Sequence, residues 1–168
     1  MRRRAEIRLV SELGADAETV WARVTDPDGI NQELGPLLRM TVPRGARDFG
    51  LDDPEPGRLG RSWVLLLGFI PFDYDDLNIV WVEPGRGFLE RSTMLSQRLW
   101  EHERTIEPRG DGRCEITDRL AWEPRLPLPG VWLKPLILAI FRHRHRRLGR
   151  ALNGAGVTPY GHSAEGVR

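Results

Sequence analysis

The chain has 168 residues, which is the size of one domain and enough to bury roughly 70% of the unfolded surface. Hydrophobic residues make up 40% and charged residues 29%, as is typical of a soluble globular protein. The net charge of +1 argues against a dedicated nucleic-acid-binding protein. The single cysteine, Cys114, excludes an intrachain disulfide and fits a reducing compartment.

No segment has the pattern of a targeting or membrane-spanning sequence. The arginines near the N-terminus precede only a short apolar stretch, residues 7–10, which Arg8 interrupts, so we expect no signal peptide. The longest apolar run, residues 133–141, contains Lys134 and Pro135 and is far shorter than the ~20 residues that span a bilayer. We therefore expect a cytoplasmic protein.

The first elements are a strand and two helices. Residues 6–13 read as a strand, and Asp16 is a suitable N-cap for a helix that begins at Ala17. The segment 26–29 ends this helix because its proline cannot continue the hydrogen-bond ladder. A short second helix is expected over residues 30–34.

Three segments follow before the first clear hairpin. Residues 37–42 are expected to form a short strand. Residues 44–61 are rich in Gly, Pro and Asp and are expected to form a long loop, either a lid over a binding site or a surface loop. Residues 62–70 are nearly continuously apolar, which predicts a strand that is covered on both faces.

The middle of the chain reads as antiparallel hairpins. The acidic segment 73–76 fits a polar turn better than a cation site, because it lacks the spacing of an oxygen-ligand loop. Residues 76–83 and 88–95 form one predicted hairpin. Residues 98–107 and 114–123 form the next, around a turn that contains two glycines and an aspartate.

The second hairpin has an inner face that mixes apolar and charged groups. We expect Ile106 to oppose Ile116, Arg104 to oppose Asp118, His102 to oppose Leu120, and Trp100 to oppose Trp122. A sheet that lines a ligand pocket would carry such polar groups. Two interpretations of the Arg104–Asp118 pair remain open: mutual neutralisation of two half-buried charges, or a role in ligand binding. His102 is either an ordinary sheet histidine or a proton-transfer group.

A long C-terminal helix is expected over residues 131–152, with one apolar face at helical spacing. Its basic run contains Arg142, Arg144, Arg146 and Arg147. Three interpretations of this basic run remain open, in order of preference: the arginines complement the helix dipole, they contact anionic lipid headgroups, or they contact nucleic acid. We expect no nucleic-acid partner. We divide the chain into one domain, residues 1–153, and a flexible tail, residues 154–168.

The order of elements predicts an α+β fold: a curved antiparallel sheet of about seven strands, two short helices after the first strand, and a long C-terminal helix across the sheet. The chain resembles the START-like or Bet v 1-like helix-grip superfamily (SRPBCC), and in particular small bacterial proteins called polyketide cyclase/dehydrase or lipid-transport-like. The resemblance lies in residues 15–21, 66–74, 100–104, 117–119 and 141–145. The resemblance implies an internal apolar cavity between the sheet and the C-terminal helix. It does not imply a catalytic residue at any position of this sequence.

No pattern indicates a hydrolase, a metal site or a cofactor. The sequence has no nucleophile elbow, and its glycines do not form a phosphate-binding loop. His143 and His145 lie two residues apart on a helix, so they cannot bind one metal ion together. We therefore expect neither a metal nor a cofactor.

The leading hypothesis is binding of a hydrophobic small molecule: a lipid, a fatty acyl chain or a polycyclic aromatic compound. Arg104 would anchor an anionic group while Asp118 holds the guanidinium, and His102 would add a second polar contact. The candidate ligand-binding residues are Trp63, Trp100, His102, Arg104, Asp118, Leu120, Trp122, Phe141 and His145.

Two alternatives remain open. One is a polyketide cyclase or dehydratase that uses the same cavity, with His102 as general acid or base and Arg104 stabilising an enolate. The other is an interaction module whose core is simply filled, for which the six tryptophans would suffice. The oligomeric state is left open.

Overall fold

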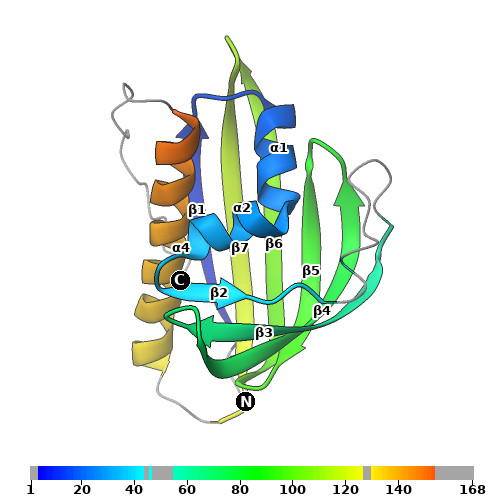
Figure 1. Ribbon diagram of the computed structural model, residues 1–168, viewed down its shortest axis with the longest axis vertical. Coiled ribbons are helices and arrows are strands. Elements are labelled where there is room, and N and C mark those ends of the chain that lie inside the picture. Colours follow the sequence, from blue (N-terminus) through cyan, green and yellow to red (C-terminus); the bar gives the residue numbers. More distant parts are fainter. Residues whose placement is uncertain (1–3, 44–45, 47–54, 127–129, 154–168) are drawn as a thin grey trace.

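A seven-stranded antiparallel sheet forms the framework of the protein (Figure 1). The computed structural model describes residues 4–43, 46, 55–126 and 130–153. The strand order is β1-β7-β6-β5-β4-β3-β2. The strands are β1 (Ala5–Leu13), β2 (Leu38–Met40), β3 (Gly57–Leu66), β4 (Ile70–Glu83), β5 (Gly87–Met94), β6 (Gln97–Gly110) and β7 (Arg113–Pro124). Every neighbouring pair is antiparallel, which confirms the predicted meander.

Two short helices follow β1: α1 (Ala17–Thr25) and α2 (Pro27–Leu34). Asp16 caps α1 as predicted, since its Oδ1 accepts a hydrogen bond from the Thr19 backbone N–H at 2.7 Å. Asp26 caps α2 in the same way, with its Oδ2 2.8 Å from the Gly29 nitrogen. Because Pro at the first helical position needs no N–H partner, α2 begins three residues earlier than predicted.

The long helix α4 (Gly130–Leu152) packs along β1 and against α2. Its inner residues Ile137 and Phe141 form a core cluster with Leu9, Leu120 and Trp122 of the sheet. A second cluster, which contains Val20, Trp21 and Val24 of α1 together with Ile106, Ile116 and Leu148, lies beneath α1. In Figure 1, α1 and α2 lie in front of β6 and β7, while β2 and β3 curl across the lower front of the sheet.

The register of the β6–β7 hairpin is the predicted one. Arg104 pairs with Asp118, His102 with Leu120, and Trp100 with Trp122. A close approach of β5 to β6 also helps to place this hairpin: a Cβ built on Gly87 would lie 2.2 Å from the Arg104 carbonyl oxygen. Only glycine fits there without a backbone shift.

The structure corrects three of the predicted segments. The predicted strand 62–70 is the end of β3, a turn and the start of β4, and it is not covered on both faces, because Trp63 is 44% and Phe69 is 71% exposed. The acidic segment 73–76 is not a turn but part of β4, with Asp73 and Asp75 buried. The predicted loop ends where β3 begins, at Gly57; residues 44–45 and 47–54 of it lie outside the described residues.

Candidate functional site

The main pocket opens between the two short helices and the concave face of the sheet. Its volume is about 490 Å³. Helices α1 and α2 form one wall, β2 and the segment after it form the rim, and β3 to β6 form the floor. Most of the lining is apolar and includes Val24, Ile30, Leu77, Ile79, Val82 and Phe88. Successive side chains of a β-strand point to opposite faces of the sheet. The floor of the pocket is therefore formed by every second side chain of these strands, on the concave face.

Besides Asp26, the N-cap of α2, three ionisable side chains are among the described residues that line this mostly apolar pocket: Glu90 of β5, His102 of β6 and Arg144 of α4. Glu90 and His102 are register partners, so they lie side by side across the β5–β6 ladder. The His102 ring lies between two aromatic rings, with the Phe88 centroid at 5.3 Å and the Phe141 centroid at 5.2 Å, both edge-on. This packing holds the imidazole in one orientation.

Asp118 ties His102 to a buried polar cluster behind the pocket. Its Oδ1 lies 2.9 Å from Nε2 of His102 and 2.7 Å from Nε of Arg104. Its Oδ2 lies 2.7 Å from Nη2 of Arg104 and 2.9 Å from Nε2 of His145. Burial alone would raise the pKa of Asp118, but the charge of Arg104, together with His102, outweighs it and holds the pKa well below the usual range. Because an ionised carboxylate only accepts hydrogen bonds, Nε2 of each histidine is the donor.

Glu33 completes this cluster from α2. Nη1 of Arg104 donates to both Glu33 oxygens, at 3.1 and 3.3 Å, and Nε of Arg144 donates to Oε2 at 3.2 Å. Glu33 is 1% exposed and Arg104 is fully buried. Burial lowers the pKa of Arg144, while the Glu33 carboxylate opposes that effect. With two arginines and two carboxylates, the cluster is neutral when its histidines are neutral, as burial of charge requires.

A second buried acidic group lies beside Glu90. Asp75 of β4 is 3% exposed, and its Oδ1 has no hydrogen-bond partner among the described residues. Ser92 Oγ donates to Glu90 Oε1 at 2.8 Å. Burial, and then the charge of Glu90, raises the pKa of Asp75 to about 10. Asp75 is therefore a neutral carboxylic acid at pH 7.

Of the candidate ligand-binding residues, only His102 lines the main pocket. Leu120, Trp122 and Phe141 are packed in the core beneath α4, and Trp100 packs against Phe141. Trp63 is 44% exposed and pairs with Tyr74 on the surface.

Arg104, Asp118 and His145 belong to the buried polar cluster and do not reach the pocket. The Arg104 guanidinium is satisfied by the protein's own carboxylates rather than turned toward a ligand. His145 uses its other ring nitrogen, Nδ1, to contact the Ser11 hydroxyl at 2.8 Å. The structure thus brings together four of the predicted residues, but as a network behind the pocket wall.

The four arginines of the basic run in α4, Arg142, Arg144, Arg146 and Arg147, do not form one exposed face. Arg144 is buried in the cluster with Glu33, and Nε of Arg147 donates to the backbone oxygen of Gln32 at 3.1 Å. Arg146 is exposed. No helix among the residues that the structure describes is long and apolar enough to cross a membrane.

Three buried acidic residues were not predicted from the sequence: Glu33 of the buried cluster, Glu90 of the pocket lining, and Asp75 beside Glu90. One signal was present for Asp75, because Asp73, Asp75, Leu77 and Ile79 continue a period-two face into the predicted turn. Glu33 carried no such signal, since its partner Arg104 is 71 positions away.

Comparison with known protein families gives one match over most of the chain. A family described as a domain of unknown function, DUF8410, matches residues 11–152. The chain belongs to this family. The DUF8410 match spans β1 to the end of α4 and so includes both the main pocket and the buried cluster. No curated protein matches the sequence.

Solved structures share the fold of this DUF8410 chain at low identity. A START superfamily protein from Mycobacterium smegmatis is 17% identical with a TM-score of 0.67, over 88% of this chain and 97% of that one. DynU16, from the dynemicin biosynthetic locus, is 18% identical with a TM-score of 0.54, over 88% and 48%. Ara h 8.0201 is 13% identical with a TM-score of 0.57, over 87% and 98%. The likeness confirms the predicted START-like helix-grip fold.

Proposed function

We propose that the main pocket binds a hydrophobic small molecule, such as a lipid, a fatty acyl chain or a polycyclic aromatic compound. The observation that carries the proposal is a pocket of about 490 Å³ with an apolar lining and a few polar groups. Ligand sites commonly have volumes of about 300–1,000 Å³ and this mixture of surfaces. The START-like fold supports the same conclusion as an analogy at the level of the fold.

The polar groups indicate how such a ligand would lie. Its apolar body would contact Ile79, Val82 and Phe88, and one oxygen would face His102 and Arg144. Arg144 is already paired with Glu33, so a neutral carbonyl or hydroxyl group fits there without adding an uncompensated charge. This assignment replaces Arg104 by His102 and Arg144 as the groups that meet the ligand.

Native mass spectrometry of the protein purified gently from its own host tests the proposal. We expect a stoichiometric extra mass, which is then identified after denaturation. Val82→Trp should fill the pocket and remove the bound compound. Val80→Trp is the matched control, because Val80 is on the same strand, is 38% exposed and does not line the pocket. Bare protein across several growth conditions would favour a filled interaction module instead. Equal retention by both variants would mean that the compound binds outside the main pocket, and would overturn the proposal.

A second candidate function is proton transfer on a polyketide-like substrate, as in a cyclase or dehydratase. It is favoured by the His102–Asp118 contact, because a carboxylate that accepts from Nε2 leaves Nδ1 as the basic nitrogen of a neutral imidazole. Substrate held against His102 would then exchange a proton with Nδ1.

Turnover of a polyketide-like substrate tests this role. His102→Gln should abolish turnover while substrate still binds. His145→Gln is the matched control, since His145 contacts the same carboxylate but does not line the pocket. Turnover that survives in His102→Gln would exclude His102 as the acid or base.

A further inference from the structure

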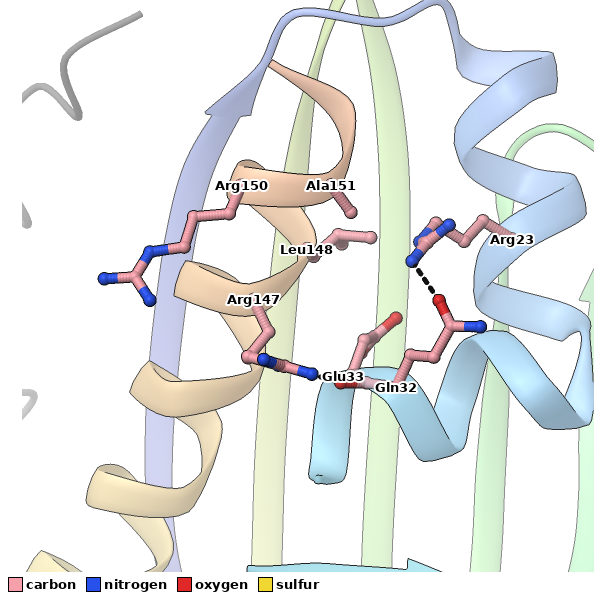
Figure 2. A pocket seen from close by; sticks show the side chains of 7 residues that line it. All are labelled: Arg23, Gln32, Glu33, Arg147, Leu148, Arg150 and Ala151. Atoms are coloured by element: carbon pink, nitrogen blue, oxygen red, sulfur yellow. Dashed lines mark hydrogen bonds between the residues drawn. The ribbon is translucent and has the colours of Figure 1, made fainter. Parts of the chain in front are cut away.

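A second pocket, of about 280 Å³, lies at the surface where α1, α2 and the end of α4 meet (Figure 2). Its lining contains the arginines Arg23, Arg147 and Arg150, with Gln32, Glu33, Leu148 and Ala151. Helix α2 contributes to both pockets: Ile30 and Asn31 line the main one, whereas Gln32 and Glu33 line this one. None of the described residues lines both pockets.

In the part of the chain that the structure describes, the arginines of this pocket have no carboxylate partners. Among the described residues, no ion pair joins Arg23, Arg147 or Arg150 to an acidic side chain. Among the described lining residues, Glu33 is the one carboxylate, and it is already held by Arg104 and Arg144. The positive charge at the pocket is therefore not neutralised by its own lining.

Two of the guanidinium groups bind the same residue, Gln32. Figure 2 shows Arg23 reaching from α1 and Arg147 reaching from α4 toward Gln32, while Arg150 points away. Nη2 of Arg23 donates to Gln32 Oε1 at 2.5 Å, and Nε of Arg147 donates to the Gln32 backbone oxygen at 3.1 Å. Nε of Arg23 is buried and has no hydrogen-bond partner among the described residues. A buried N–H without a partner is costly unless a ligand accepts from it.

We propose that this pocket binds the phosphoryl group of a small phosphomonoester between Arg23 and Arg147. The planar fork of arginine matches phosphate oxygens, and two guanidinium groups balance the nearly two charges of a phosphomonoester at pH 7. The small apolar surface of Leu148 and Ala151 leaves room for a short organic part. The site is separate from the main pocket and stands whether or not the main pocket binds an apolar ligand.

Isothermal titration calorimetry with glycerol 1-phosphate and with inorganic phosphate tests the proposal. Arg23→Gln and Arg147→Gln should each weaken glycerol 1-phosphate binding about tenfold or more, because each removes a charge-assisted hydrogen-bond donor. Arg146→Gln is the matched control: it removes the same charge from the same helix at an exposed position outside the pocket. This control should change binding by less than about twofold at 0.15 M salt. Thermal unfolding of each variant checks that the fold is kept.

A second experiment, binding to lipid vesicles, distinguishes a soluble phosphomonoester from a lipid headgroup as the ligand. Phosphatidylcholine vesicles with added phosphatidic acid present a phosphomonoester on a membrane, whereas phosphatidylglycerol presents only a diester of similar charge sign. Arginine-dependent binding of glycerol 1-phosphate supports a soluble ligand, and arginine-dependent binding confined to phosphatidic acid supports a lipid headgroup. The proposal is overturned if neither probe binds, or if Arg146→Gln weakens binding as much as Arg147→Gln. In that case the arginines only complement the C-terminal ends of α1 and α4.

Discussion

Replacing Asp118 by Asn tests whether the buried cluster stabilises the fold through charge. Asp118 is fully buried and accepts two hydrogen bonds from Arg104 at 2.7 Å, and one from each of His102 and His145 at 2.9 Å. The amide has nearly the same shape, but it is neutral and turns an N–H₂ group toward donors. Removing one partner of a buried charge pair costs about 3–5 kcal/mol, a large part of the roughly 5–15 kcal/mol of a typical domain.

The assay is urea unfolding with a thermal melt of the same samples. We expect a loss of about 3–5 kcal/mol for Asp118→Asn. That loss corresponds to a fall of roughly 6–20 °C in Tm for a domain of this size. The matched control is Asp111→Asn in the β6–β7 turn, where the side chain is 91% exposed and asparagine accepts the positive φ of 53°. A loss below about 1 kcal/mol for Asp118→Asn would refute the reasoning, since it would mean that the cluster does not depend on the carboxylate charge.

The pH dependence separates lost charge from altered packing. The pKa of Asp118 is held well below its ordinary value of 3.8, so the folded state binds this proton less readily than the unfolded chain. The stability that comes from this group is therefore present above pH 3.8 and is lost as the pH falls through the folded pKa. The difference between the wild type and Asp118→Asn should narrow below about pH 4. A difference that stays constant on acidification would indicate a packing defect.

Three further predictions concern the sheet. Because the pKa of Asp75 is raised from 3.8 to about 10, the folded state binds an extra proton between these pH values, and the free energy of unfolding falls as the pH rises through this window. Asp75→Asn should remove this pH dependence of stability. Urea unfolding of both proteins at pH 5 and pH 8 checks it. Leu120→Ala should cost about 2–5 kcal/mol in urea unfolding, because Leu120 is 2% exposed in the core beneath α4; a cost under about 1 kcal/mol would contradict that packing. Gly87→Ala places a Cβ 2.2 Å from the Arg104 carbonyl oxygen and should cost about 1–3 kcal/mol more than Gly85→Ala, which has a positive φ but open space around it; equal losses would argue against the close approach.

The local pattern was enough for most elements. The cap at Asp16, the register of Arg104 with Asp118 and the length of α4 follow from capping, turn chemistry and side-chain period, which involve residues close in sequence. The hydrophobic pattern gave the wrong elements at residues 62–76, because a continuous apolar run does not indicate which face of a strand is exposed to solvent. The buried residues Asp73 and Asp75 of β4 then resembled a turn because their partners, Ser96 for Asp73 and Glu90 for Asp75, lie outside that strand.

By itself, the sequence determined the α+β class, the order of the hairpins and the alternation that places His102, Arg104 and Asp118 on the inner face. Only the tertiary structure decided what those groups meet. Glu33 joins Arg104 across 71 positions and Arg144 across 111, and these contacts depend on how α2 and α4 cross the curved sheet. That crossing is set by packing between elements distant in sequence, so the location of the pocket followed from the assembled core and not from any local pattern.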